Sequence, residues 1–284
     1  MMTARYRIEH TSSYRYDQAV TASFNEVRLT PAALPWQNAL ESTLRADQAT
    51  WQYRYVDYWG TQVRVFEAQQ PHRELVVATS STVEVDGSRR ARLPDSFDWE
   101  LLRTEAVRDE LAEYLANSPT TSPPEEFLGL VGEAVAGLDA SGAAEAVVRL
   151  VNESMTYLPG STGVQTLAAE AWAERSGVCQ DYAHLTVGAL RHLGIPARYV
   201  SGYLHPSAEP MVGETVQAES HAWVQSWLGQ WYDHDPTNLS EVLERHVQIG
   251  TGREYGDVTP LKGIVAGSPA TTDLDVSVAI TRLA

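Results

Sequence analysis

The segment that begins at Cys179 constrains the fold more than any other part of the chain. It follows Gly177 and a valine, and Gly194 and Pro196 stop it at its far end, so it predicts a helix from Cys179 to Leu193. Apolar side chains leave little polar surface on any side of this helix; they are Tyr182, Ala183, Leu185, Val187, Gly188, Ala189, Leu190 and Leu193. A helix that is apolar on most sides has to be covered on most sides. The sequence therefore predicts a central, buried helix.

Cys179 is the only cysteine in the 284 residues, and it stands in the first turn of this helix. The unpaired N–H groups and the dipole of a helix start favour a thiolate, and the N–H of Cys179 itself is placed to stabilise an oxyanion. Gly177 allows a substrate to approach the backbone closely. These features indicate a nucleophile. The alternative is an inert core thiol, because free cysteine is among the most buried residue types.

A nucleophilic thiol needs a base, and His221 is the strongest candidate among the eight histidines. The stretch ESHAWVQSWLGQWYDHDPTN predicts a β-hairpin with strands 221–227 and 231–235, in which Trp223 shares the face of His221. The alternative for His221 is a structural histidine on a half-buried strand. Three other histidines are expected to pack in helices or to have no chemical role: His184, His192 and His246.

The length of the hairpin loop decides whether an acid can orient this imidazole. A three-residue loop, Leu228–Gln230, pairs the two flanking tryptophans and makes Asp235 the diagonal neighbour of His221 on the same face. With a two-residue loop Asp235 faces away, and Asn238 takes its place. The site is therefore expected to be a Cys-His-Asp triad or, with the shorter loop, a Cys-His-Asn arrangement.

The first part of the chain has the pattern of β-strands. Apolar and polar residues alternate in ELVVATSSTVEV, which puts Leu75, Val77, Val83 and Val85 on one face. We predict an antiparallel β-domain over residues 1–95 that carries no catalytic residues, and a second domain over residues 96–284 with a helical lead-in and a catalytic core. The segment 272–283 also alternates and predicts a strand, but the pattern leaves open which sheet it joins.

Composition excludes several classes of partner. The net charge is −16 and there is no basic cluster, which argues against nucleic acid as a partner. The start lacks the apolar run of a signal peptide and no segment is long enough to span a bilayer, so we expect a cytoplasmic protein without a membrane partner. No two histidines have ligand spacing on a single element, so no metal and no cofactor are expected. The oligomeric state is left open.

Four segments in this order resemble the core of the transglutaminase-like superfamily: GVCQDYAHL, ARYVSGYL, ESHAWVQSWL and WYDHDPTN. That superfamily includes transglutaminases, cysteine proteases and peptide N-glycanases on a papain-like fold. RYRIEHTSSYRYDQAVTASFNEVRLTP resembles the N-terminal β-region of its bacterial branch, and HVQIGTGREYGDVTPLKGIVAG resembles the C-terminal segment of that branch. The resemblance implies an α+β protein in which a central helix bearing the cysteine packs on an antiparallel sheet. It also implies the triad Cys179, His221 and Asp235.

The same resemblance implies acyl transfer through a thioester. Features of the animal crosslinking enzymes that this sequence lacks favour hydrolysis over crosslinking. Gln180 stands where animal transglutaminases have a tryptophan, the stretch around Trp172 does not match their upstream tryptophan, and acidic calcium-binding loops are not found. We therefore expect a peptidase or amidase that acts on a peptide or another amide. The alternatives are an amine-transferring transglutaminase and a non-catalytic binding or scaffolding protein on the same fold. The candidates for the oxyanion site or the substrate cleft are Gln165, Gln180, Trp223 and Tyr255.

Overall fold

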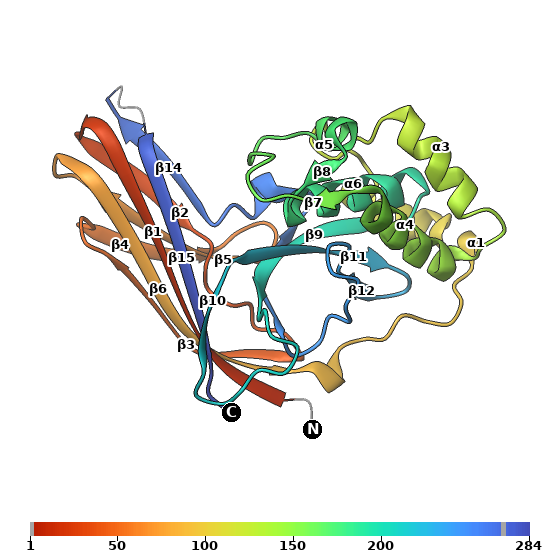
Figure 1. Cartoon of the computed structure of the whole chain (residues 1–284), viewed down its shortest axis with the longest axis horizontal. Coiled ribbons are helices and arrows are strands. Elements are labelled where there is room, and N and C mark those ends of the chain that lie inside the picture. Colours follow the sequence, from red (N-terminus) through yellow and green to blue (C-terminus); the bar gives the residue numbers. More distant parts are fainter. Residues whose placement is uncertain (1–2, 268–270) are drawn as a thin grey trace.

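The computed structural model describes residues 3–267 and 271–284, and it has an α+β fold with two bodies side by side (Figure 1). One, the β-body, consists of long antiparallel strands. In the other, the α/β-body, helices cover a smaller antiparallel sheet. The predicted fold class is therefore confirmed.

The β-body contains two antiparallel sheets. The first has the strand order β10-β15-β1-β6-β3 and consists of β10 (Thr215–Ala218), β15 (Thr271–Arg282), β1 (Thr3–Val20), β6 (His72–Asp86) and β3 (Gln37–Ala46). The second has the order β14-β2-β5-β4 and consists of β14 (Leu261–Ala266), β2 (Ala22–Val27), β5 (Gln62–Ala68) and β4 (Trp51–Val56). The alternation predicted in residues 74–85 is confirmed, because Leu75, Val77, Val83 and Val85 are all buried along β6.

The last strand of the chain belongs to the β-body. β15 pairs with β1 from Tyr6↔Arg282 to Tyr16↔Thr271, and β10 pairs along the other edge of β15. The strand predicted in residues 272–283 thus joins the N-terminal sheet. The boundary expected at residue 95 marks the change from strands to helices along the chain, and three later strands return to the first body.

The α/β-body is built around α6 (Cys179–His192). Every residue from Gln180 to Arg191 is buried, so the predicted central helix is confirmed. One side of α6 packs on a sheet of order β12-β11-β9-β13, formed by β12 (Trp231–His234), β11 (Ser220–Trp227), β9 (Ala197–Leu204) and β13 (His246–Gly252). Burying a leucine such as Leu185 or Leu190 contributes about 1.5–3 kcal/mol, so the helix is held mainly by its apolar contacts.

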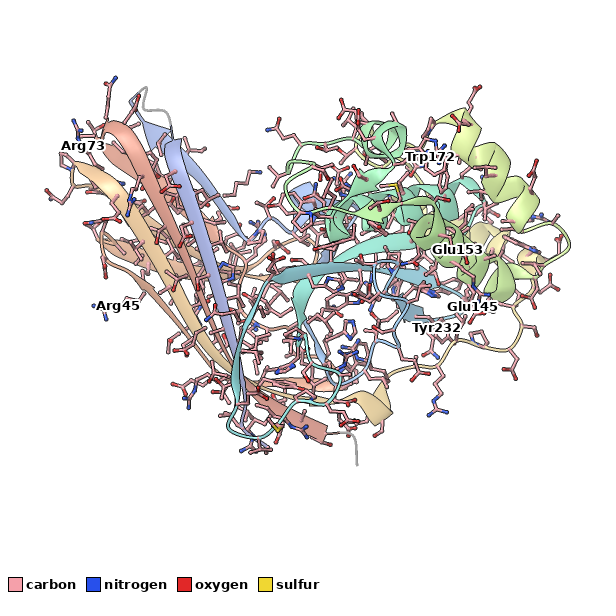
Figure 2. The ribbon with its side chains drawn as sticks, in the orientation of Figure 1. Arg45, Arg73, Glu145, Glu153, Trp172 and Tyr232 are labelled. Carbon is pink, nitrogen blue, oxygen red and sulfur yellow. The ribbon has the colours of Figure 1, made fainter. Side chains whose placement is uncertain are left out.

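Further helices cover the rest of α6. Three helices contact α6: α3 (Glu125–Ala134), α4 (Ala140–Ser154) and α5 (Ala168–Glu174). The short helices α1 (Trp99–Leu102) and α2 (Glu105–Glu110) precede them along the chain, and a short parallel pair joins β7 (Thr156–Tyr157) to β8 (Ser176–Gly177). Single 3-10 turns occur at η1 (Gly87–Arg89), η2 (Ala112–Tyr114) and η3 (Tyr255–Asp257). Trp172 of α5 packs against Phe127 of α3 with ring centroids 4.4 Å apart, in the helical layer of Figure 2. None of the helices in the described residues is long and apolar enough to cross a bilayer.

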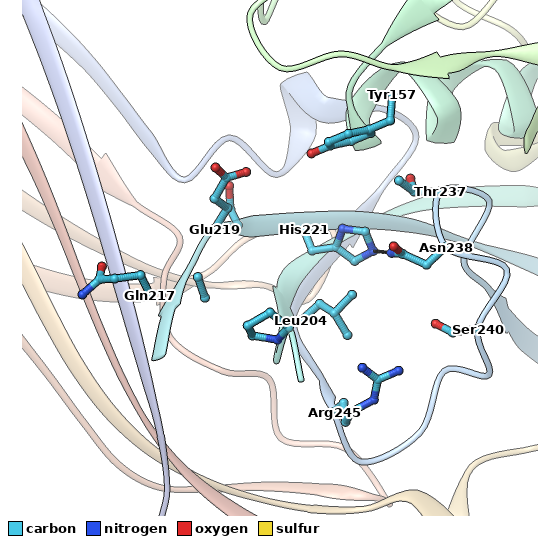
Figure 3. A pocket seen from close by; sticks show the side chains of 12 residues that line it. Tyr157, Leu204, Gln217, Glu219, His221, Thr237, Asn238, Ser240 and Arg245 are labelled. Atoms are coloured by element: carbon cyan, nitrogen blue, oxygen red, sulfur yellow. Dashed lines mark hydrogen bonds between the residues drawn. The ribbon is translucent and has the colours of Figure 1, made fainter. Parts of the chain in front are cut away.

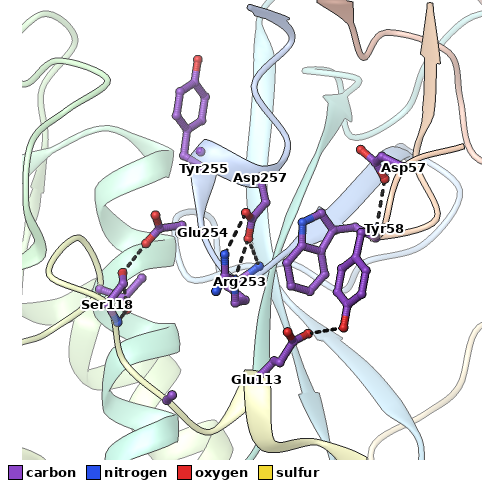
Figure 4. A network of polar contacts seen from close by, with 12 residues as sticks. Asp57, Tyr58, Glu113, Ser118, Arg253, Glu254, Tyr255 and Asp257 are labelled. Carbon is purple, nitrogen blue, oxygen red and sulfur yellow. Dashed lines mark hydrogen bonds and ion pairs between the residues drawn. The ribbon is translucent and has the colours of Figure 1, made fainter. Parts of the chain in front are cut away.

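The two bodies share a hydrophobic core. Tyr203, Val247 and Ile249 of the α/β-body sheet are buried in one cluster with Tyr6 and Ile8 of β1. At another point of contact, Figure 4 shows a set of polar contacts in which Tyr58 of the β-body donates to Glu113 (3.0 Å), and Ser118 donates to Glu254. The β-body is therefore packed firmly against the sheet that carries His221.

Candidate active site

The start of α6 presents the Cys179 side chain, which is only partly buried. Oδ2 of Asp181 accepts from the N–H of Val178 (2.8 Å) and from the hydroxyl of Thr162 (2.6 Å). This carboxylate caps the helix and fixes the preceding loop beside it. A Cβ on Gly177 would lie 2.6 Å from the same carboxylate oxygen, so a glycine is needed there. The cysteine thus occupies the predicted helix start, on a rigid support.

The hairpin has the register that brings Asp235 to His221. Trp227 pairs with Trp231 and Val224 with His234, which confirms the three-residue loop. Asp235 directly follows β12, and its Oδ2 lies 2.9 Å from Nε2 of His221. The geometry predicted for these two side chains is therefore present.

His221 also contacts the cysteine. Cys179 is near enough to act on the charge of the His221 imidazole, and because Nε2 faces Asp235, the nitrogen left for sulfur is Nδ1. Burial opposes a charge on His221, but the hydrogen bonds to Asp235 and Cys179 and the charges of both groups outweigh it and raise the pKa of His221 to about 10. The imidazole is therefore protonated at neutral pH, which stabilises a thiolate next to it.

Asp235 is the most densely hydrogen-bonded group of the site. Besides His221, its Oδ2 accepts from Asn238 Nδ2 (2.9 Å) and His246 Nε2 (3.2 Å), and its Oδ1 accepts from the N–H groups of Thr237 (3.0 Å) and Asn238 (3.1 Å). Burial disfavours the charged carboxylate, but the hydrogen bonds and charges of the two imidazoles, His221 first, hold the pKa of Asp235 well below its usual range. The carboxylate is ionised, and Asn238 assists it where the sequence presented the two as alternatives.

His246 is a member of this cluster that the sequence did not reveal. It comes from β13, which pairs with β9, and β9 lies between β13 and the strand β11 that carries His221. Burial lowers the pKa of His246 despite the neighbouring Asp235, so the ring is neutral and donates through Nε2–H. Among the described residues its buried Nδ1 has no hydrogen-bond partner. To predict this position of His246, one has to know that β13 pairs with β9. No local sequence pattern indicates that pairing.

Trp223 supports the imidazole from behind. It is fully buried, its ring is nearly parallel to that of His221 with centroids 6.1 Å apart, and its Nε1 donates to Asp233 (2.8 Å). A Cβ on Gly202 of the neighbouring strand would lie 2.6 Å from this indole. The tryptophan therefore fixes the position of His221 and is not exposed to a substrate.

A cleft of about 810 Å³ opens at His221. Figure 3 shows Tyr157 and Asn238 near His221, with Glu219 and Arg245 further along its wall. Burial, followed by the charges of Cys179 and Glu219, raises the pKa of Tyr157 to about 12, so its hydroxyl stays protonated as a donor. Tyr157 was not predicted, because it lies in a two-residue strand without a recognisable motif.

The remaining sequence candidates divide into two groups. Gln180 is buried beside Cys179, and its Nε2 donates to the carbonyl oxygen of Gly163 (3.4 Å), which supports the loop ahead of α5. Gln165 is exposed in the same loop, and within the described residues its side chain makes no hydrogen bond. Tyr255 is not among the residues that line the cleft; its N–H donates to Nε2 of His184 (3.2 Å). Thus Gln165, Gln180 and Tyr255 are all absent from the lining of the cleft at His221, as is Cys179 itself.

The imidazoles and the carboxylate also form a possible set of metal ligands. One ligand atom each of His221, Asp235 and His246 lies within 4.8 Å of the others, on three buried residues. Each of the two Nε2 atoms already forms a hydrogen bond with Asp235 Oδ2, so these ligand atoms are in use, while Nδ1 of His246 has no partner among the described residues. A metal ion here would break the bond between His221 and Asp235.

The fold and the site define a protein with a papain-like arrangement of cysteine, histidine and aspartate. Residues 6–84 match the family model of the bacterial transglutaminase-like N-terminal region, and residues 131–236 match that of the transglutaminase-like superfamily. The chain therefore belongs to the transglutaminase-like superfamily and carries the N-terminal region of its bacterial members.

Similar proteins agree with this assignment. An uncharacterized protein of Mycobacterium leprae is 44% identical over 281 residues, which cover 99% of each chain. A solved structure described as a "Putative Cysteine Protease from Cytophaga hutchinsonii" matches with a TM-score of 0.72 at 20% identity, covering 97% of this chain and 92% of the other, and it shows the shared fold. A protein-glutamine gamma-glutamyltransferase of Pseudomonas aeruginosa is 36% identical over 88 residues, which cover 29% of this chain and 13% of that protein.

Proposed function

We propose that this protein is a cysteine peptidase or amidase that cleaves an amide bond through a thioester on Cys179. The observation that carries the proposal is the position of His221 between Cys179 and Asp235: its Nε2 lies 2.9 Å from Oδ2 of Asp235, Cys179 is near enough to act on its charge, and its side chain lines a cleft. Burying an ionised carboxylate and a charged imidazole costs free energy. A binding protein on the same fold would have no use for such a pair beside a partly exposed thiol, which argues for catalysis.

In the first half-reaction the Cys179 thiolate attacks the amide carbonyl carbon, and a carbon–sulfur bond forms. Negative charge moves to the carbonyl oxygen, where the free N–H groups at the start of α6 and the hydroxyl of Tyr157 are the available donors. Nδ1–H of His221 then gives its proton to the leaving nitrogen, and the carbon–nitrogen bond breaks. The products are a free amine and a thioester.

In the second half-reaction the neutral His221 takes a proton from water through Nδ1 as the water oxygen attacks the thioester. The carbon–sulfur bond breaks, a carboxylic acid leaves, and the thiolate–imidazolium pair is restored. Throughout, Asp235 accepts the Nε2–H of His221 and holds the imidazole in the tautomer that leaves Nδ1 facing sulfur.

The position of the hairpin tryptophans supports water over an amine as the acceptor. An amine acceptor needs a site that excludes water and holds the amine against the thioester. Trp223 is fully buried, Trp227 packs edge-on to Phe97 (6.3 Å between centroids), and Trp231 packs on Tyr114 (5.1 Å). None of these three aromatic side chains is among the residues that line the cleft at His221, so they do not form an amine site there.

The experiment is a competition between the two acceptors. A peptide library is turned over in ¹⁸O water with a labelled primary amine at millimolar concentration, and Cys179→Ala serves as the inactive control. We expect most product as acid that carries ¹⁸O. Label mainly in the amine adduct would establish the alternative, a transglutaminase, which the similarity to the P. aeruginosa transferase over 88 residues favours. Product formed equally by Cys179→Ala would contradict both.

A further inference from the structure

One arginine that lines the cleft, Arg245, forms no ion pair among the residues that the structure describes. The chain has a net charge of −16, with 37 acidic and 21 basic residues, and in the described residues eight of its 20 arginines form an ion pair with a carboxylate. Arg90 forms an ion pair with Asp233 (2.8 Å), and Arg28 forms one with Asp57 (3.0 Å). Arg245 lines the cleft at His221, and in the described part of the chain no carboxylate lies within ion-pair distance of it.

Backbone carbonyls hold Arg245 in place. Its Nη1 donates to the carbonyl oxygens of His205 and Ser207, at 3.3 Å each. Carbonyl groups orient a guanidinium without cancelling its charge, and an arginine side chain remains charged at any physiological pH. Arg191 is also held by carbonyl oxygens, but there Nε, Nη1 and Nη2 all have acceptors. In Arg245, among the described residues, only Nη1 has one, so most of its donors are unused.

The guanidinium end points into the cleft. In Figure 3 the Arg245 side chain rises from the wall below His221, towards the space bounded by Leu204 and Ser240. Glu219 lies on the other side of His221, near Tyr157. The cleft thus has a cation on one side of the imidazole and an anion on the other. A negatively charged ligand group is attracted to the Arg245 side and repelled from the Glu219 side.

We propose that Arg245 is a carboxylate-binding residue, and that the substrate is an amide that carries a free carboxylate on the Arg245 side of the bond to be cleaved. The inference rests on the proposed function of this cleft. An acidic side chain or a terminal carboxylate of a peptide fits the unused donors, because a guanidinium binds a carboxylate through two parallel N–H···O bonds. The cleft then selects acidic amides over neutral ones of the same size.

Matched alkylating probes test this without knowledge of the substrate. N-bromoacetyl derivatives of ω-amino acids with two to five methylene groups are compared with their carboxamides. In each, the Cys179 sulfur bonds to the CH2 carbon and bromide leaves. The measurement is the second-order rate of Cys179 labelling by intact-protein mass spectrometry. At the best chain length we expect the acid to react roughly tenfold faster than its amide.

Variants assign the preference to Arg245. Arg245→Gln should bring the ratio of the labelling rates of acid and amide probes close to one. Arg245→Lys, which keeps the charge but not the planar guanidinium, should retain part of the preference for the acid. Arg282→Gln is the matched control, because Arg282 also donates to carbonyl oxygens, those of Pro210 and Ala284, and lies outside the cleft lining. It should leave the ratio unchanged.

The outcomes separate this inference from the proposed function. A ratio of one or less at every chain length in the wild type would overturn the carboxylate site while leaving the reactive thiol intact. A preference that survives in Arg245→Gln would also overturn it, since the charge of His221 would then be its source. The rate with the neutral amides shows whether Arg245→Gln has disturbed the turn at residues 205–207. No labelling of the wild type by either probe would contradict the proposed function itself.

Discussion

Asp235→Asn is the substitution that best tests how His221 is held. Oδ1 of Asp235 accepts from two backbone N–H groups, those of Thr237 and Asn238, so the amide oxygen of an asparagine has to take that position. The amide NH2 then faces Nε2 of His221, which is 2.9 Å from Oδ2 in the native protein. His221 must present a bare Nε2 to it, with its proton on Nδ1. That tautomer cannot accept a proton from Cys179 or from water.

The size of the effect follows from the charge that Asp235 supplies. A group with a pKa of about 10, as His221 has, is protonated about 1,000 to 1 at pH 7. Without the Asp235 charge, burial lowers the pKa of His221 and only Cys179 remains to raise it, so fewer molecules keep the proton at pH 7. A triad with the wrong tautomer loses about 10⁴ in kcat in the serine protease example. We therefore expect kcat/KM to fall by about 10³–10⁴.

The assay measures peptide turnover and iodoacetamide alkylation between pH 5 and pH 10. The pKa of His221 is raised, so in the wild type the imidazole keeps its positive charge as the pH rises past 6.5 and loses it only near pH 10. In Asp235→Asn the charge of His221 should be lost at a clearly lower pH. Asp139→Asn, which changes the helix cap of α4 far from the cleft, is the control. A variant that keeps the wild-type pH profile and stays within tenfold of its rate would refute the orienting role of Asp235.

Three further changes probe the surroundings of the triad. His246→Leu removes a donor to Asp235, so kcat should fall about tenfold with KM unchanged. His246→Gln should restore part of the lost kcat. Equal kcat values for the wild type and both variants would show that His246 has no positioning role. Gly202→Ala places a Cβ 2.6 Å from the Trp223 ring and still closer to the backbone oxygen of Val247. Overpacking by about 1–3 kcal/mol should lower the melting temperature by several degrees, whereas an unchanged transition would count against this close packing. Removal of metals with EDTA should leave turnover unaltered, because the ligand atoms of His221, Asp235 and His246 are already in use in hydrogen bonds; loss of turnover that zinc restores would make the cluster a metal site.

Local patterns predicted the parts of the fold that local forces determine. The apolar faces of α6 required burial, and the alternation in β6 required a sheet with one covered face. The hairpin was predicted in most detail, because one choice of loop length fixes the register of every residue in both strands. With Trp227 opposite Trp231, the contact between His221 and Asp235 follows.

Contacts between distant strands could not be predicted in this way. β15 joins β1 although more than 250 residues separate them, and nothing in the alternation of β15 names its partner. The positions of His246 and Arg245 depend on the pairing of β13 with β9, and that of Tyr157 depends on the short parallel pair next to Cys179. Gln165 was chosen for its side-chain chemistry alone, and its loop leaves that side chain exposed. Each of these required tertiary structure.

The central claim is that His221 activates Cys179, and the rate of iodoacetamide labelling against pH tests it most directly. In the wild type we expect fast labelling of Cys179 already below pH 7, because the charged imidazole stabilises a thiolate. In His221→Ala the rate should rise only towards pH 8.5, as it does for a free thiol in solution. Identical profiles for the two proteins, both rising only in that alkaline range, would contradict the account.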